Sequence, residues 1–149
     1  MPRDVTAAVE VRRPRSDAER EAALALRRVV FCDEQGVSPT EEFDGRDAEA
    51  LHLAAFTGDR LVGTCRLLFA GDRARFGRLA VARDARRHGA GAALLAAAEI
   101  EVRAAGAALI VLHAQTRART LYDRQGYTTR GREFTEAGIA HVTMEKVVA

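Results

Sequence analysis

The chain has no tryptophan, one lysine (Lys146) and two cysteines, Cys32 and Cys65, in 149 residues. Two isolated cysteines form neither a disulfide framework nor a metal-ligand spacing, and they suit a reducing compartment. No run reaches the roughly 18 apolar residues that a membrane-spanning helix needs, and residues 1–17 lack the apolar core of a secretory signal. These absences predict a cytoplasmic protein without a metal and without a membrane partner.

A large excess of one charge is also lacking, because 23 lysines and arginines face 21 aspartates and glutamates, for a formal net charge of +2. Acids alternate with arginines along most of the chain, whereas a nucleic-acid-binding protein needs a concentrated basic face. We therefore expect no nucleic-acid partner. The 48% of hydrophobic and 30% of charged residues are typical of a globular chain, and the length suits one domain over residues 1–149.

Hydrophobic periodicity and turn signals divide the chain into strands and helices. Ser16 and Glu19 form a capping box at the start of the first helix, and Gly106 ends a long alanine-rich helix. We expect strands at residues 5–13, 51–56, 61–69, 75–81, 108–112, 127–134 and 139–147. We expect helices at residues 17–31, 89–105 and 116–125, and a short helix or an ordered loop at 41–47. This order predicts an α+β fold, in which a mixed, mostly antiparallel sheet of six or seven strands has helices on both faces.

A glycine-containing turn follows the fourth expected strand and opens the long helix. It carries the pattern Arg86-x-x-Gly89-x-Gly91. Backbone N–H groups at a helix N-terminus, with glycines that let a ligand approach closely, are suited to bind phosphate, and Arg86 and Arg87 add charge for a diphosphate. An ordinary tight turn or a dinucleotide-binding fold also shows Gly-x-Gly. The second of these is disfavoured because the loop follows an antiparallel meander and position 94 is leucine.

The element order, the glycine loop and the turn Tyr122-Asp-Arg-Gln-Gly-Tyr127 together resemble the GNAT N-acetyltransferases over essentially the whole chain. The resemblance implies that the fourth and fifth strands splay apart around acetyl-CoA. It also implies that the backbone of the fourth strand pairs with the pantetheine arm and that the N–H of Val81 polarises the thioester carbonyl. The cofactor-binding residues implied are Leu79, Ala80, Val81, Arg86, Arg87, His88, Gly89, Ala90, Gly91 and Ala92.

Tyr122 matches the tyrosine that, in this family, protonates the departing thiolate of CoA. A phenol has a reference pKa of ~10 and a thiol ~8.5, so Tyr122 acts either as an acid or as a hydrogen-bond donor to the sulfur, unless it only packs over a helix end. The amine needs a general base, and we favour His113 at the end of the fifth strand. The other candidates are Glu34, Asp44, His52 and His141. Neither cysteine is expected to act as a nucleophile.

Longer segments are similar to the ElaA-type branch of this family, namely residues 27–37, 42–47, 50–53 and 134–144. This similarity implies that the acceptor side of the site is lined by Phe31, Glu34, Gln35 and His141. The acidic residues between positions 41 and 49 are either a solvated loop or a hint of a cationic acceptor.

The resemblance implies an acetyl-CoA-dependent N-acetyltransferase. Its acceptor would be a primary amine of a small molecule or a peptide, and the amine would attack directly in a ternary complex. A different class, an acyl-CoA-binding sensor or scaffold without turnover, would use the same loop. A third is synthesis of a signal by acyl transfer to an amino-acid-like acceptor, as in acyl-homoserine-lactone synthases. It is disfavoured because the chain is short for that group and because the complete Arg86–Gly91 loop indicates CoA rather than a carrier protein as the donor. A homodimer is expected only by analogy with the family.

Overall fold

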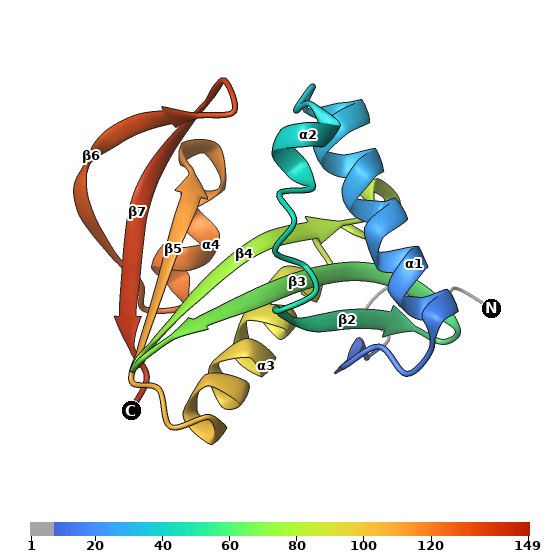
Figure 1. The fold of residues 1–149 in the computed structure, drawn as a ribbon, viewed down its shortest axis with the longest axis horizontal. Coiled ribbons are helices and arrows are strands. Elements are labelled where there is room, and N and C mark those ends of the chain that lie inside the picture. Colours follow the sequence, from blue (N-terminus) through green and yellow to red (C-terminus); the bar gives the residue numbers. More distant parts are fainter. Residues whose placement is uncertain (1–7) are drawn as a thin grey trace.

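A computed structural model describes residues 8–149 and arranges them around one sheet with the strand order β1-β2-β3-β4-β5-β7-β6 (Figure 1). The strands are β1 (Glu10–Arg12), β2 (Leu51–Thr57), β3 (Arg60–Ala70), β4 (Arg73–Val81), β5 (Leu109–Gln115), β6 (Thr128–Glu136) and β7 (Ile139–Val147). The helices are α1 (Asp17–Arg27), α2 (Pro39–Glu42), α3 (Ala90–Ala104) and α4 (Arg119–Arg124). Only β4 and β5 pair in parallel, and all other neighbours are antiparallel. The predicted α+β class is therefore confirmed.

The first helix begins as its capping box predicts, with the Ser16 hydroxyl accepting a hydrogen bond from the N–H of Glu19 at 3.1 Å. It continues beyond Arg27 as a π-helix over Arg28–Glu34, which the side-chain pattern does not predict. A single 3₁₀ turn, Thr116–Ala118, precedes α4. Of the first expected strand, residues 5–7 lie outside the described residues, and β1 is confined to Glu10–Arg12.

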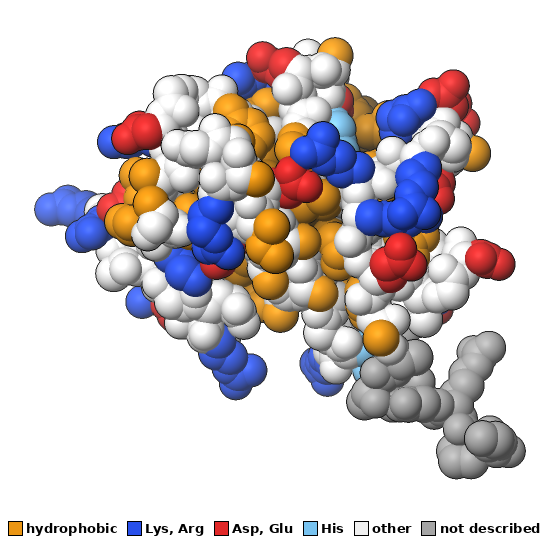
Figure 2. Space-filling model, turned by 90° about the horizontal axis from the view of Figure 1, so that it is seen from below, with side chains coloured by type: hydrophobic (Ala, Val, Ile, Leu, Met, Phe, Trp, Pro, Cys, Tyr) orange, Lys and Arg blue, Asp and Glu red, His pale blue; other side chains and the backbone are white. Residues whose placement is uncertain are grey.

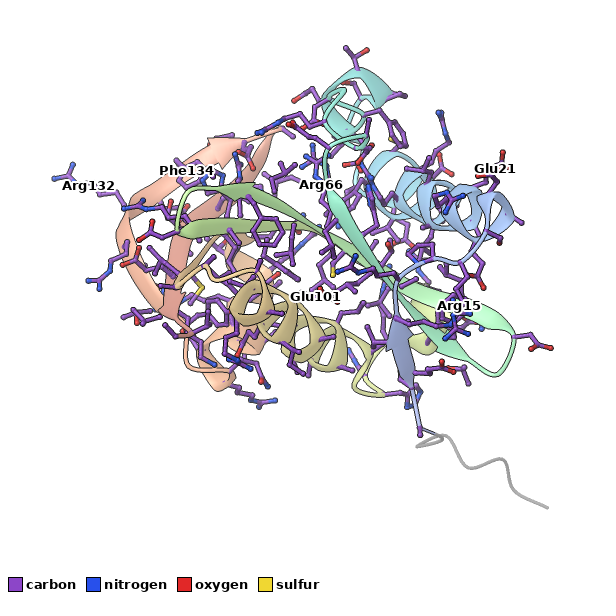
Figure 3. The ribbon with its side chains drawn as sticks, turned by 60° about the horizontal axis from the view of Figure 1, so that its bottom comes forward. Arg15, Glu21, Arg66, Glu101, Arg132 and Phe134 are labelled. Carbon is purple, nitrogen blue, oxygen red and sulfur yellow. The ribbon has the colours of Figure 1, made fainter. Side chains whose placement is uncertain are left out.

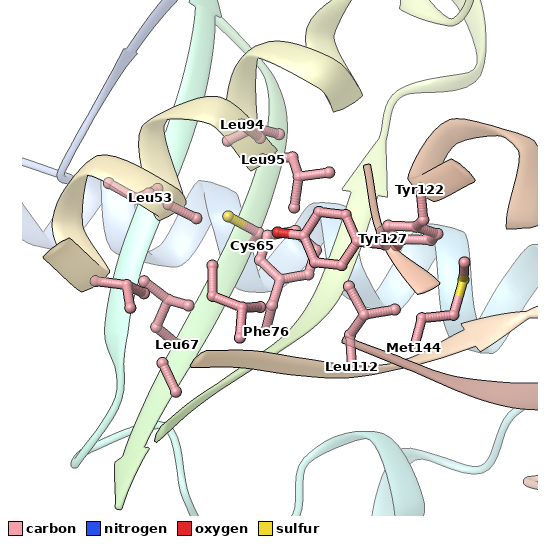
Figure 4. Packing of buried hydrophobic residues seen from close by; sticks show 14 of the residues in the cluster. Leu53, Cys65, Leu67, Phe76, Leu94, Leu95, Leu112, Tyr122, Tyr127 and Met144 are labelled. Atoms are coloured by element: carbon pink, nitrogen blue, oxygen red, sulfur yellow. The ribbon is translucent and has the colours of Figure 1, made fainter. Parts of the chain in front are cut away.

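The main core lies between the sheet and α3. Leu94 and Leu95 of α3 are fully buried and pack with Phe76 of β4 in one cluster (Figure 4). On the other face, α1 and α2 lie over the β2–β4 half of the sheet and leave the β5–β7–β6 half uncovered in this view (Figure 1). The apolar run in β5 is therefore buried fully on one face only: Ile110 and Leu112 lie in the core, whereas Leu109 and Val111, on the other face, are half-buried.

The sheet opens at its centre, as the resemblance implies. β4 and β5 are paired only from Arg73 to Phe76 and from Leu109 to Leu112, and they diverge beyond these residues (Figure 1). At the same point β4 contains a bulge, because Arg78 and Leu79 together oppose one residue of β3 and Arg78 has a φ of 56°. A bulge of this kind bends its strand and raises the local twist, so it helps to turn β4 away from β5.

Candidate functional site

The splay forms a cleft of about 1230 Å³ that receives side chains from the π-helix after α1, from α2, from the strands and from the loops. One wall, called the donor side because the acyl donor is expected there, is built by the end of β4, the turn before α3 and the start of α4. The opposite wall, called the acceptor half, is built by the segment after α1 and the β6–β7 hairpin. Elsewhere, charged groups of both signs are interspersed on the surface, as the face seen from below shows (Figure 2).

The turn between β4 and α3 presents free backbone donors to this cleft. Gly89 has a φ of 87° and Arg87 a φ of 67°, so the chain reverses sharply before α3. The first N–H groups of a helix have no partner within it, and those of Ala90, Gly91 and Ala92 lie in this position. A Cβ on Gly89 would meet no atom within 4 Å, so its positive φ rather than packing accounts for the glycine.

Arg86 does not extend freely into the cleft. Its Nε donates to the carbonyl of Val81 at 3.0 Å and its Nη2 donates to Oε2 of Glu34 at 2.6 Å. Glu34, expected on the acceptor side, therefore pairs with the loop that is expected to bind phosphate. Of the ten predicted cofactor-binding residues, Ala80 and His88 are the two that do not line the cleft. Ala80 packs beneath Val30 and Phe31 instead.

The end of β4 has unpaired N–H groups directed into the splay. Ala80 pairs with Thr64 of β3, and the N–H of Ala82 donates to the carbonyl of Val62 at 2.8 Å. Because hydrogen-bonding directions alternate along an antiparallel strand, the N–H groups of Leu79 and Val81 point away from β3. Both groups are thus oriented as the expected pairing with an extended ligand requires.

Tyr122 lies on α4 at the inner wall of the cleft and is only 7% exposed. Its ring makes edge-to-face contacts with Phe76 and Tyr127, with centroid distances of 6.4 and 6.0 Å (Figure 4). Among the described residues, its hydroxyl makes no hydrogen bond. Burial raises the pKa of Tyr122, so the phenol stays protonated and is available as a donor.

Tyr127, the second tyrosine, belongs to the core. Its hydroxyl donates to Glu99 at 3.0 Å, and the same carboxylate accepts a hydrogen bond from Lys146 at 3.0 Å. Burial and the charge of Glu99 raise the pKa of Tyr127. The single lysine of the chain therefore neutralises Glu99, a buried glutamate of α3.

His113 faces the acceptor half of the cleft. Its Nδ1 lies 3.0 Å from Oε1 of Glu136 and 3.0 Å from Nη2 of Arg75. One nitrogen cannot donate and accept at once, so Nδ1 either donates its proton to Glu136 or accepts one from Arg75. The first arrangement leaves Nε2 without a proton and able to act as a base.

His141 lies beside this group and is held by its backbone. Its Nδ1 donates to the carbonyl of Ile139 at 2.7 Å, which leaves Nε2 as the acceptor of the neutral ring, 3.8 Å from Glu136. The ring stacks on Phe134 of the β6–β7 hairpin, labelled in Figure 3. Glu136 and Arg75 were not predicted as site residues, although Glu136 belongs to the segment that resembles the ElaA-type branch.

Two other expected acceptor residues also line the cleft. Phe31 is 9% exposed and packs on Ala80. The side chain of Gln35 accepts a hydrogen bond from Gln115 of β5 at 2.8 Å, so it links the segment after α1 to the far side of the splay.

Four of the five acidic residues at positions 41–49 pair with arginines, and the exception is Glu41, whose carboxylate accepts a hydrogen bond from the Ser38 hydroxyl. Glu42 pairs with buried Arg27 at 2.7 Å, and Asp44 pairs with Arg66 at 2.7 Å. Figure 3 shows Arg66 beside the connection from α2 to β2. The remaining pairs are Asp47 with Arg27 and Arg66, Glu42 and Asp44 with Arg78, and Glu49 with Arg46. These ion pairs neutralise Glu42, Asp44, Asp47 and Glu49, so little of this acidic charge is left for a cationic acceptor.

The other candidates lie apart from the reaction geometry. His52 does not line the cleft, and its Nε2 donates a hydrogen bond to the carbonyl of Asp47 at 2.8 Å. Cys65 is buried, and burial raises the pKa of its thiol. Within residues 8–149, no three histidine, cysteine or acidic side chains are grouped to hold a metal ion. In the same part of the chain, no helix is long and apolar enough to cross a membrane.

Comparison with known proteins agrees with this geometry. Residues 18–148 match the model of the acetyltransferase (GNAT) domain. The chain belongs to the GNAT acetyltransferase family. It is 32% identical to YyaT of Bacillus subtilis over 144 residues, which cover 95% of this chain and 97% of that protein.

Solved GNAT structures have the same fold. An acyl-CoA N-acyltransferase from Pseudomonas aeruginosa superposes with a TM-score of 0.79 at 27% identity, covering 94% of this chain and 99% of that one. ElaA of Escherichia coli superposes with a TM-score of 0.80, covering 93% and 98%, and at 24% identity this likeness concerns the fold. The resemblance to the GNAT family that the sequence shows is therefore confirmed.

Proposed function

We propose that this GNAT protein transfers an acetyl group from acetyl-CoA to a primary amine by direct attack in a ternary complex. The observation that carries the proposal is the free N–H groups at the start of α3, next to a splayed β4 whose own N–H groups of Leu79 and Val81 face the opening. A diphosphate suits the helix terminus, and an extended amide-containing arm suits the strand.

The reaction needs three groups. The amine nitrogen attacks the thioester carbonyl carbon, and the N–H of Val81 or Leu79 stabilises the oxyanion. The proton lost by the amine passes to Nε2 of His113 while its Nδ1 donates to Glu136. The carbon–sulfur bond then breaks and the thiolate leaves toward Tyr122. Because burial raises the pKa of Tyr122, a hydrogen bond to the sulfur is favoured over full proton transfer.

Titration calorimetry of the protein with acetyl-CoA, with NADH as the control ligand, tests the donor. We expect micromolar affinity for acetyl-CoA and none for NADH. An acceptor screen that follows release of the CoA thiol tests turnover. Absence of acetyl-CoA binding would mean that the Arg86–Gly91 loop is an ordinary turn, and it would overturn the proposed acetyltransferase function. Binding without any turnover would favour the alternative of an acyl-CoA-binding sensor.

A further inference from the structure

The arginines that line the cleft fall into two groups. Most have a carboxylate within 3.5 Å, as Arg66 has Asp44, Arg78 has Glu42 and Arg86 has Glu34. Within the described part of the chain, the cleft arginines without such a partner are Arg75, Arg87, Arg117 and Arg124. Arg87 lies in the turn before α3, and Arg117 and Arg124 lie in the 3₁₀ turn before α4 and in α4 itself, so all three are on the donor side. Arg75 alone lies in the acceptor half, where β4 and β5 meet.

Arg75 has no strong partner. It is 49% exposed, its Nη2 lies 3.0 Å from Nδ1 of His113, and the nearest carboxylate oxygen, on Glu136, is 3.9 Å away. A guanidinium offers a planar fork of N–H donors that matches a carboxylate. An arginine left in this state inside a cleft is therefore available to an anionic group of a ligand.

Gly77 makes room beside this guanidinium. It follows Arg75 by two residues and so faces the same side of the sheet. It is not among the glycines with a positive φ, and a Cβ placed on it would meet no atom within 4 Å. Neither backbone conformation nor packing accounts for a glycine here, and a strand glycine often marks the close approach of a ligand.

We infer that the acceptor carries a carboxylate near its amine, as a small amino acid does, and that Arg75 binds this carboxylate above Gly77. This inference rests on the proposed function and names its substrate class. The amine of such a molecule faces Glu136 and His113. Drawing Arg75 onto the substrate also removes the competing donor from Nδ1 of His113. That nitrogen then donates to Glu136, and Nε2 is left without a proton.

The test is a set of matched acceptors assayed by thiol release. Each set contains a free amino acid, its carboxamide and the amine that lacks the carboxylate, across the standard side chains and short ω-amino acids. We expect the free acids to be the better acceptors in the wild type. Arg75→Gln is expected to raise KM for the free acids by about tenfold or more and to leave KM for the carboxamides unchanged.

Arg73→Gln is the matched control, because Arg73 lies on the same strand and face but does not line the cleft. It is expected to leave every KM unchanged. Three results would overturn the inference: carboxamides used as well as the acids, equal effects of Arg75→Gln on both, or no turnover of the whole panel by protein that binds acetyl-CoA. Failure to bind acetyl-CoA in calorimetry would instead overturn the proposed function itself.

Discussion

Nη2 of Arg86 donates to Oε2 of Glu34 at 2.6 Å, although the two residues are 52 positions apart in the chain. This ion pair connects the turn before α3 to the segment that follows α1, and thus joins the two walls of the cleft. A bound diphosphate would compete with Glu34 for the same guanidinium.

Glu34→Gln is therefore expected to strengthen acetyl-CoA binding. It frees Arg86 and removes a negative charge near the phosphates. The pair is partly exposed, so the gain is modest, about two- to fivefold in Kd. Calorimetry measures it, with Glu49→Gln as the control because Glu49 pairs with an arginine away from the loop. Weaker binding in Glu34→Gln would mean that the ion pair instead holds Arg86 in its binding position.

Gly89→Asp is expected to abolish binding of acetyl-CoA in calorimetry. The substitution places a carboxylate against the diphosphate, at a position whose φ of 87° disfavours any side chain. Gly71→Asp provides the control, since Gly71 has a φ of 61° in the β3–β4 turn, outside the cleft. Equal affinities in the two variants would remove the proposed phosphate site.

Tyr122→Phe is expected to lower kcat by about tenfold or more while sparing the Kd of acetyl-CoA, because only a donor to the leaving sulfur is lost. Tyr127→Phe is the control, and it is expected to change stability and not turnover. It removes a buried hydrogen bond to Glu99, so the free energy of unfolding falls by about 1 kcal/mol and turnover stays the same. Thiol-release kinetics and urea unfolding separate the two, and wild-type turnover in Tyr122→Phe would end its proposed role.

His113→Ala tests the general base through the pH dependence of kcat/KM. A base must be unprotonated to act, so the wild-type rate is expected to fall as the pH decreases, and the variant is expected to lose this acidic limb. His52→Ala should keep it, because His52 bonds the carbonyl of Asp47 outside the cleft. An acidic limb that persists in His113→Ala would direct attention to Nε2 of His141.

Asp44 links stability to pH. Its hydrogen bond from Arg66 holds the pKa of this carboxyl well below its usual range. A depressed folded-state pKa adds stability that is present above the unfolded value of ~3.9 and is lost as the pH falls below it. Asp44→Asn is thus expected to lower the free energy of unfolding by about 1 kcal/mol at pH 7, with a smaller difference at pH 3. Urea unfolding at both pH values measures this, and a constant difference would contradict the linkage.

The sequence by itself determined most of the helices and strands and the glycine-containing turn before α3. Caps, glycines and hydrophobic periodicity act over a few residues, so the helix start at Ser16 and the Arg86–Gly91 turn could be predicted locally. The π-helix over Arg28–Glu34 could not, because its wider hydrogen-bonding has no distinct side-chain signal.

The tertiary structure alone decided how the charges are used. The acids between positions 41 and 49 look like a free anionic loop in sequence, yet Asp44 and Glu42 are neutralised by arginines of β3 and α1. Likewise, the cluster of Arg75, His113 and Glu136 exists only because the fold brings three different strands, β4, β5 and β6, to one opening. Such contacts join residues far apart in the chain. Which arginines remain free for a ligand therefore follows from packing, and no local pattern encodes it.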